Sequence, residues 1–534
     1  MHKQILGMET EYSTSMVAAN GSDYSLRTGL RSFLNHLHRE LEHVLDLDSR
    51  GAYLINGARF YIDYGQHPEY ATPECGDPTE LVSQVFAGDK LMLTVADRMR
   101  ARSKVVEGIT FLTSNVEHSG SHTTCGCHES YSHRGEPSRL APVMTAFLVS
   151  RLIWSGAGGI DNTFPGVRFL LSPRVAHIHE AISGDSTRHR PIFHTKNEPL
   201  CSGYNRLHVI CGDSIRSHVG VWLKGGVTAV VLALAEAGLL DSSISELALQ
   251  APVSAMHKFA ADPSVEAPAT LASGPRVTAI ELQRRYHALA ERYIDHPCLP
   301  EWGPDVIEWW GDTLEKIERT PRELATTFDW AIKRELFEQH LNSRGLTVDD
   351  LPALNTSLVQ ELDKKKNENV GPRQLSLFPQ LASILAGNGR VRRSRPTTDI
   401  VMRSQEPETL PPELQELLEI RRELCVLDLR FGQLGEAGIF NQLDAAGLID
   451  HHVPGVDVER ATKEAPRDTR AAARSRAIQE LRAEPERARK SRVSWNAVYD
   501  GHQGLQIRLR DPFQTTAVWE NVPDESWDDD DTPY

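Results

Sequence analysis

The chain has 534 residues, of which 40% are hydrophobic and 25% are charged, so it can bury a large core and form two or three domains. Its formal net charge of −15 argues against nucleic acid as a partner, because surfaces that bind nucleic acid are usually basic. We expect no membrane span, no signal peptide and a cytoplasmic location, since the seven cysteines are mostly scattered as in proteins with reduced thiols.

The N-terminal segment places two carboxylates on one face of a predicted strand. An apolar start, Gln4-Ile5-Leu6, leads into GMETEY at residues 7–12. Glu9 and Glu11 are two residues apart, so both side chains project from the same face of a strand. Two parallel carboxylates repel each other unless a cation lies between them. Oxygen ligands of this kind suit Mg²⁺ or Mn²⁺, which in turn hold the phosphates of a nucleotide.

Residues 56–75, NGARFYIDYGQHPEYATPEC, form the densest polar motif of the chain. The stretch 59–64 lies between two glycines and is rich in β-forming residues, which predicts a short strand. Period-two geometry places Arg59, Tyr61 and Asp63 on one face and apolar side chains on the other. His67, Glu69 and Glu74 follow the turn. A solvated sheet edge with salt bridges is the alternative interpretation of such a cluster.

Helices and strands alternate along the rest of the chain. Apolar residues at helical spacing predict helices at residues 25–45, 79–102, 140–156 and 217–238, and three more within 279–344. Short β-rich stretches at 108–113, 167–172 and 205–213 predict strands. The chain is therefore expected to have an α+β fold.

Further polar residues extend the candidate site. His128 ends the sequence Cys125-Gly126-Cys127-His128, which offers the start of a zinc site but has no second paired-ligand motif to complete it. In the strand predicted at 205–213, Arg206 and His208 share a face. Guanidinium groups clamp phosphate oxygens, which makes four further arginines candidates: Arg188 and Arg190, and the helical pair Arg470 and Arg474. The last two alternatively hold the carboxylate of a bound partner or cap acidic neighbours.

Four motifs occur in the order GMETEY, NGARFYIDYGQHPEYATPEC, GCHESY and RLHVICGD. This series resembles the Pup ligase and depupylase family, a branch of the carboxylate–amine ligases related to glutamine synthetase. The resemblance implies a large curved antiparallel sheet backed by helices, with a small C-terminal domain. It also implies a use of ATP and Mg²⁺, with Mn²⁺ as a possible substitute. Ser130 within GCHESY, and the segment Thr195-Lys196-Asn197-Glu198-Pro199, depart from the family's usual residues.

The resemblance and the chemistry together assign roles to the candidate residues. Glu9, Glu11 and His128 are expected to bind the metal, with Glu69 and His208 as further ligands. Arg206 is expected to contact the phosphates of ATP, together with Arg188 or Arg190 and with Arg470 and Arg474. Asp63 is the expected general base for a lysine ammonium, and Tyr61 is expected to orient the metal or the base.

The expected reaction is ATP-dependent phosphorylation of the C-terminal glutamate of a small acidic protein modifier, Pup-like or ubiquitin-like, which is then joined to a substrate lysine through an isopeptide bond. A deamidase or isopeptidase acting on the same modifier is the nearest alternative, because the site chemistry does not separate the two directions. A phosphotransferase and a small-molecule carboxylate–amine ligase are more distant ones. The short connection between Glu11 and Ile62 is closer to the ligases, since depupylases of the family carry a long insertion there.

The expected domain order has five parts. Residues 1–345 form the glutamine-synthetase-like catalytic domain, and residues 346–410 are a charged insertion or linker. Residues 411–450 return to the catalytic domain as helices, residues 451–515 form the small C-terminal domain, and residues 516–534 are an acidic tail.

Overall fold

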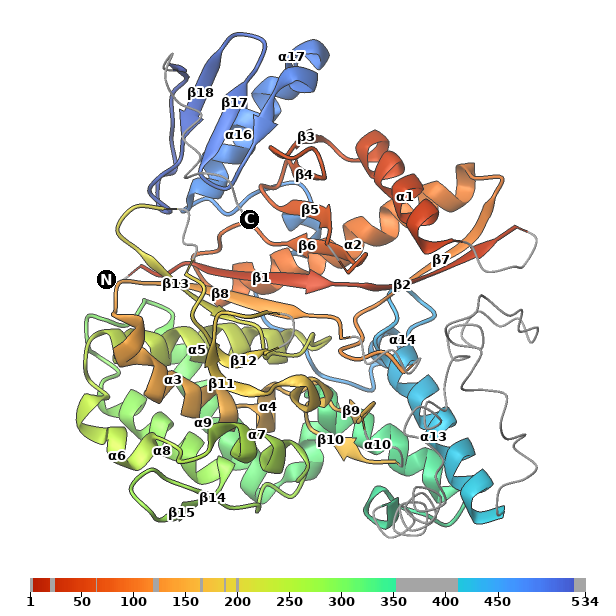
Figure 1. Ribbon diagram of the computed structural model, residues 1–534, viewed down its shortest axis with the longest axis vertical. Coiled ribbons are helices and arrows are strands. Elements are labelled where there is room, and N and C mark those ends of the chain that lie inside the picture. Colours follow the sequence, from red (N-terminus) through yellow and green to blue (C-terminus); the bar gives the residue numbers. More distant parts are fainter. Residues whose placement is uncertain are drawn as a thin grey trace, which may run out of the picture.

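A computed structural model describes the following residues of the chain: 3–19, 25–63, 65–118, 124–163, 167–186, 189–197, 201–351 and 412–522. In this part of the chain the central feature is a nine-stranded sheet (Figure 1). Its strands are, in spatial order, β11 (Glu180–Ser183), β12 (Pro191–His194), β13 (Asn205–Val209), β8 (Cys127–His133), β1 (Leu6–Glu11), β6 (Pro68–Ala71), β5 (Arg59–Ile62), β4 (Gly51–Leu54) and β3 (His43–Leu45). Its neighbouring strands are antiparallel, except that β11 runs parallel to β12 at one edge.

Strand β1 lies at the centre of this sheet, and its two faces differ as the sequence predicts. Leu6, Met8 and Thr10 are buried, whereas Glu9 and Glu11 alternate with them on a partly open face. Burying apolar side chains on one side of a strand therefore leaves both carboxylates on the other. Because β1 is central, they stand in the middle of the sheet.

Helices cover the apolar face of the sheet. Leu6 and Met8 belong to one large core with residues of α2 (Pro78–Arg102), α3 (Pro137–Ser150) and α5 (His218–Glu236). The other helices that contribute to this core are α4 (Leu152–Ser155), α6 (Ile244–Leu247), α7 (Pro252–Ala260), α8 (Ala279–Arg292), α9 (Gly303–Arg319), α10 (Asp329–Asn342) and α13 (Pro412–Phe431). Figure 1 shows α3, α5, α8 and α9 grouped on one side of β1 and β8.

Helix α5 is long and apolar enough to cross a membrane by length and composition. However, 94% of its apolar window is buried inside the protein, as in the core helix of a globular domain. Ser217 caps its N-terminus by accepting a hydrogen bond from the N–H of Gly220. The prediction of a long buried helix at residues 217–238 is confirmed.

One predicted helix is partly wrong. Helix α1 covers Leu26–Glu40, whereas His43–Leu45 form the edge strand β3 and pair with β4. Val44 belongs to a separate core that includes Tyr53 of β4 and apolar residues of the C-terminal layer. Tertiary packing thus overrides the helical spacing of Leu41, Val44 and Leu45.

The C-terminal region forms a separate small layer against the β3–β4 edge. Its sheet contains β16 (Arg492–Val493), β17 (Ala497–Asp500), β18 (Leu505–Arg508) and β19 (Glu520–Asn521), and it packs with α16 (Arg470–Arg482) and α17 (Pro485–Lys490). A bridge between Asp46 and Val493 connects this sheet to the turn between β3 and β4. Figure 1 shows the layer beside one edge of the main sheet.

Strand β2 (Ser13–Ala18) pairs with β7 (Val106–Leu112). The other strands and α-helices of the described residues are β9 (Gly159–Ile160), β10 (Phe169–Leu170), β14 (Ala269–Thr270), β15 (Arg276–Val277), α14 (Ile439–Ala445) and α15 (Val458–Ala461). The predicted antiparallel sheet with helical backing and a small C-terminal unit is confirmed, apart from the one parallel pair. The domain boundaries stay predictions. Most of the 346–410 insertion and most of the acidic tail lie outside the described residues.

Candidate active site

Strand register brings five predicted metal ligands together on the open face of the sheet. Across β1 and β6, Glu11 lies opposite Glu69; across β1 and β8, Glu9 lies opposite His128. His208 of β13 lies opposite Ser130, the residue two positions after His128. His128 Nδ1 is 3.3 Å from Glu9 Oε2, and His128 Nε2 is 3.9 Å from Glu11 Oε1.

The ligand atoms form two overlapping sets that suit a divalent cation. In one set, potential ligand atoms of Glu9, His128 and His208 all lie within 4.8 Å of one another; Glu11, Glu69 and His128 form the other set on the same criterion. Glu69 Oε1 and His208 Nε2 are buried without a hydrogen-bond partner, as expected of atoms arranged for a ligand. The five residues together offer three carboxylates and two imidazoles, and the set of Glu11, Glu69 and His128 is mainly carboxylate, which favours Mg²⁺ or Mn²⁺.

The electrostatics of the three carboxylates agree with a cation site. Burial, together with the negative charges of Glu9 and Glu11, raises the pKa of Glu69 well above its usual value. Burial also raises the pKa of Glu9, but the hydrogen bond from His128 and the charges of His208, His128 and Arg206 outweigh it and hold that pKa below the usual range. Three converging carboxylates repel one another, and a divalent cation between them removes that cost.

Asp63 directly follows β5 and lies beside this cluster. Its Oδ1 accepts a hydrogen bond of 2.6 Å from the main-chain N–H of His67. His67 Nδ1 lies 3.6 Å from both Asp63 Oδ2 and Glu11 Oε2, so the imidazole stands between the two carboxylates. Burial raises the pKa of Asp63, but hydrogen bonds from His67 and the charge of its ring lower it overall. Asp63 is therefore ionised at neutral pH and available as a proton acceptor.

Tyr61 lies directly opposite Glu69 across β5 and β6. Burial and the charges of Glu69 and Glu9 raise the pKa of Tyr61 well above its usual value, so the phenol keeps its proton. Arg59 covers the ring of Tyr61, with its guanidinium carbon 4.4 Å from the ring centroid, and Arg59 is itself held by Asp46 at 2.7 Å. Tyr61 is thus placed to orient Glu69, one of the predicted metal ligands, while its predicted role of orienting the metal or the base stays a prediction.

Gly126 permits the close approach of Glu11 and His128. Its main-chain N–H donates a hydrogen bond of 2.6 Å to Glu11 Oε2. A Cβ atom at this position would lie 2.5 Å from His128 Nε2 and 2.9 Å from Glu11 Oε1. Any side chain at this position would therefore displace two of the predicted ligands.

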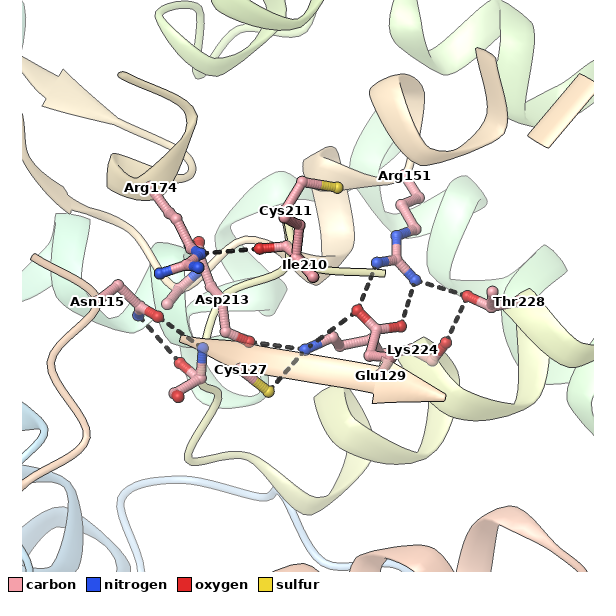
Figure 2. Close-up of polar contacts among 12 residues, drawn as sticks. Asn115, Cys127, Glu129, Arg151, Arg174, Ile210, Cys211, Asp213, Lys224 and Thr228 are labelled. Atoms are coloured by element: carbon pink, nitrogen blue, oxygen red, sulfur yellow. Dashed lines mark hydrogen bonds and ion pairs between the residues drawn. The ribbon is translucent and has the colours of Figure 1, made fainter. Parts of the chain in front are cut away.

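A buried ionic network packs against β8 on the core face of the sheet, opposite to the face that carries His128 (Figure 2). Glu129, the neighbour of His128 on the opposite face, accepts hydrogen bonds of 2.8 and 2.6 Å from Arg151. Lys224 of α5 lies 3.4 Å from Glu129 and donates to Cys127 Sγ at 3.2 Å and to the carbonyl of Asp213 at 2.7 Å. The charged side chains are nearly inaccessible, so the network fixes the strand that carries His128.

The zinc alternative at residues 125–128 is not supported. Strand alternation places Cys127 on the core face of β8, where it contacts Lys224, while His128 faces the opposite side. Both Cys125 and Cys127 are buried, and burial raises the pKa of each thiol. In the described residues neither sulfur belongs to a group of three potential metal ligands.

A pocket opens next to Glu9, between the main sheet and the C-terminal layer. It contains about 700 Å³ of space outside the protein atoms, open solvent included. Its walls are formed by main-sheet residues from β1, β6, β8 and β13, and by the C-terminal residues Arg470, Trp495 and Pro512. Arg206 lines it and also donates a hydrogen bond of 3.2 Å to His208 Nδ1. The pocket thus reaches from the metal-binding cluster to an aromatic wall.

The other predicted phosphate-binding arginines have different outcomes. Arg188 lies outside the described residues. Arg190 donates to the carbonyl of Ser186 at 3.1 Å, and burial and the charge of Arg174 lower its pKa, while the charge of Glu11 raises it. Arg190 therefore lies close enough to Glu11 to add positive charge to the electrostatic environment of the site.

The assignment of Arg474 to phosphate is wrong. Arg474 is fully buried and bonds to Glu74, to the carbonyl of Gly57 and to the carbonyl of Trp495. Arg470 also binds Glu74, with Nε 2.6 Å from Oε1, but it still lines the pocket. The two arginines use the alternative role of pairing with an acidic residue, because Glu74 needs both charges in a buried position.

Two histidines of the site were not assigned from the sequence. His67 lies between Asp63 and Glu11, as described above. In the sequence it is recognisable only as one of the polar residues that follow the turn after residue 64, which gives it no specific role. His194 of β12 lies opposite His208, with 5.2 Å between the ring centroids, and its buried Nε2 has no hydrogen-bond partner. Sequence alternation offered no signal for His194, because β12 is buried on both faces.

Comparison with known proteins agrees with this geometry. The family model described as Pup-ligase protein matches residues 4–408 and 414–499. Pup–protein ligase 1 of Rhodococcus erythropolis is 34% identical over 358 residues, which cover 66% of this chain and 77% of the relative; a Pup–protein ligase of Rhodococcus opacus (strain B4) gives the same identity and coverage.

Two solved structures share the fold. The complex between the prokaryotic ubiquitin-like protein Pup and its ligase PafA has a TM-score of 0.71 at 23% identity and covers 96% of this chain and 89% of that one. The ligase PafA in complex with ADP has a TM-score of 0.65 at 23% identity, with coverage of 93% and 94%. Because the family model matches most of the length of this chain, the chain belongs to the Pup-ligase protein family.

Proposed function

We propose that this protein is an ATP-dependent ligase that joins the C-terminal glutamate of Pup to lysine side chains of substrate proteins. The observation that carries the proposal is the convergence of Glu9, Glu11, Glu69, His128 and His208 on one sheet face, with Asp63 beside them, in a chain of the Pup-ligase family. Relatives with 34% identity are named Pup–protein ligases.

The pocket next to Glu9 is the proposed nucleotide site. Arg206 stands between the pocket and the carboxylate–imidazole cluster, where a phosphate chain would meet the metal ligands. Trp495 on the opposite wall offers an aromatic face for a base. We propose that Glu9, Glu11, Glu69, His128 and His208 hold Mg²⁺, which when bound neutralises phosphate charge and aligns the transferred group.

The chain's own residues then serve two steps. In the first step, the modifier's carboxylate attacks the γ-phosphorus of ATP, giving an acyl phosphate and ADP; Arg206 stabilises the charge of the phosphates. In the second step, the lysine nitrogen attacks the acyl carbon and inorganic phosphate leaves. Asp63 removes the proton that the lysine ammonium must lose, and His67 holds its carboxylate in place. Tyr61 keeps Glu69 oriented.

Purified full-length protein tests the proposal. It is incubated with Pup, ATP, Mg²⁺ and a lysine-bearing protein, and conjugates are measured by mass spectrometry together with ADP. We expect conjugates whose mass equals the sum of both proteins less one water, with one ADP formed for each conjugate. Release of Pup from a preformed conjugate without ATP consumption, and no conjugate formation, would contradict the ligase assignment and favour an isopeptidase.

A cytoplasmic location stays a prediction. All seven cysteines are free, with five of them buried, which supports a reducing compartment. Fractionation of cells that produce the protein tests this prediction directly.

A further inference from the structure

Three histidines gather away from the active site, at the start of α5. His218 is the first residue of that helix, and His451 and His452 lie in the connection between α14 and α15. The ring centroid of His218 is 4.8 Å from that of His451 and 5.2 Å from that of His452, and the latter two are 4.2 Å apart. One ring nitrogen of each residue lies within 4.8 Å of the others.

Aromatic side chains hold two of these rings in place. The ring of His218 packs on Phe86 of α2, and that of His451 packs on Phe440 of α14. His218 Nδ1 is buried without a hydrogen-bond partner. Neutral imidazoles with an available nitrogen are the form that binds metals.

A carboxylate completes the cluster. Asp444 Oδ1 of α14 lies 3.3 Å from His451 Nε2 and 3.0 Å from His452 Nε2. Carboxylates next to histidines orient the rings of metal sites or act as a further ligand.

From this arrangement we propose that His218, His451 and His452, assisted by Asp444, bind a borderline transition-metal ion, with Zn²⁺ foremost. Three nitrogen donors select Zn²⁺, Cu²⁺ or Ni²⁺ over Mg²⁺, which prefers oxygen. The proposed site differs in this respect from the carboxylate-rich cluster of the active site. It also lies on the helical side of the molecule, because α5 packs on the core face of the sheet.

Metal binding requires small local movements. Zinc–nitrogen bonds of about 2.0–2.1 Å in a tetrahedral site place the ligand atoms about 3.4 Å apart, so the rings close by about an ångström. His451 Nδ1 now accepts a hydrogen bond of 3.2 Å from the main-chain N–H of His218. To bind the ion, His451 must give up one of its ring contacts, either that of Nδ1 with the His218 N–H or that of Nε2 with Asp444. The 3.0 Å hydrogen bond from the Val219 N–H to the carbonyl of His451 does not involve the ring and is preserved.

A metal ion at this site would link two segments that are distant in the sequence. Helix α14 and the residues after it follow segment 352–411 in the chain, whereas α5 is a buried helix of the main core. A metal held by His218 from one side and by His451 and His452 from the other links these two parts without a covalent bond. Binding of the ion to the folded protein alone raises its stability.

The experiment uses the full-length protein freed of metal with a chelator and then equilibrated with Zn²⁺ in excess Mg²⁺. Bound zinc is counted by elemental mass spectrometry after gel filtration, and the melting temperature is measured with and without Zn²⁺. His452 has an exposed side chain, so His452→Gln leaves the fold intact. We expect wild type to retain one zinc ion after gel filtration. His452→Gln should bind zinc more than about tenfold more weakly and lose it in this step. Zn²⁺ should raise the melting temperature of wild type and not that of His452→Gln.

Two controls separate this site from other histidines. His502→Gln removes an exposed histidine of the C-terminal layer, and Glu9→Gln removes a ligand of the active site. Both variants should retain the zinc that His452→Gln loses. If His452→Gln binds as much zinc as wild type, or if the zinc is lost in Glu9→Gln instead, the proposal is overturned. Visible absorption of Co²⁺ in place of Zn²⁺ gives a second readout, because four-coordinate Co²⁺ should appear in wild type and not in His452→Gln.

Discussion

The main-chain N–H of Gly126 donates a 2.6 Å hydrogen bond to Oε2 of Glu11, and this contact joins the residue that precedes β8 to the end of β1. The absence of a side chain at Gly126 lets His128 and Glu11 approach each other on the same sheet face.

Gly126→Ala should reduce ligation by about 10²-fold or more, because the new methyl group would displace His128 Nε2 and Glu11 Oε1 and a misplacement of about 1 Å is enough for such a loss. The rate of ADP-coupled conjugate formation measures the effect. The matched control is Gly108→Ala, where the nearest atom to the new Cβ is 3.9 Å away. Equal activity of the two variants would show that the close approach is dispensable.

Asp63→Asn should lower conjugate formation by about 10²–10⁴-fold, since the amide cannot accept the proton of the lysine ammonium. Nucleotide binding should persist, because Asp63 is absent from the pocket wall next to Glu9. Conjugate assays and nucleotide titrations separate the two effects. Asp48→Asn, which changes an exposed aspartate before β4, is the control. Unchanged turnover in Asp63→Asn would remove Asp63 from the role of base.

Glu69→Gln should change stability and activity in opposite directions. Without a metal, the substitution removes one of three converging carboxylates and so raises the melting temperature. With Mg²⁺, it removes a ligand and weakens metal affinity by at least about tenfold. Thermal unfolding with and without Mg²⁺ tests both statements. A variant that is less stable than wild type in chelator would contradict the repulsion argument.

The attachment of the C-terminal layer should depend on pH through Glu74. Burial raises the pKa of Glu74, but the charges of Arg474 and Arg470 lower it overall, from 4.5 to about 2. A lowered pKa means that the stabilisation is complete above pH 4.5 and is lost as the pH falls toward 2. A shift of this size corresponds to about 3 kcal/mol.

Glu74→Gln should therefore destabilise the protein by about 3–5 kcal/mol at neutral pH, because two buried guanidinium groups lose their partner. As the pH falls below about 2 the variant and wild type should converge, because Glu74 is then largely neutral in both the folded and the unfolded protein. Denaturant unfolding at several pH values, with Glu107→Gln as an exposed control, measures this dependence. A constant difference between Glu74→Gln and wild type across this range would contradict the assignment.

Local periodicity was sufficient to predict which residues share a face. Glu9 and Glu11 face one side of β1, and Tyr61 and Arg59 face one side of β5, because side chains alternate along any strand. The long apolar helix after residue 217 and the three helices within 279–344 were predicted from their spacing for the same reason. The order of the four motifs identified the family.

Only the tertiary structure decided which of these faces meet. The pairing of Glu11 with Glu69 and of Glu9 with His128 depends on β1 lying between β6 and β8, and strand order is set by packing of the whole core and not by any local pattern. The same packing directs Arg474 to Glu74 instead of a phosphate. It likewise brings His218 beside His451, residues more than two hundred positions apart, because contacts between distant segments are absent from local sequence periodicity.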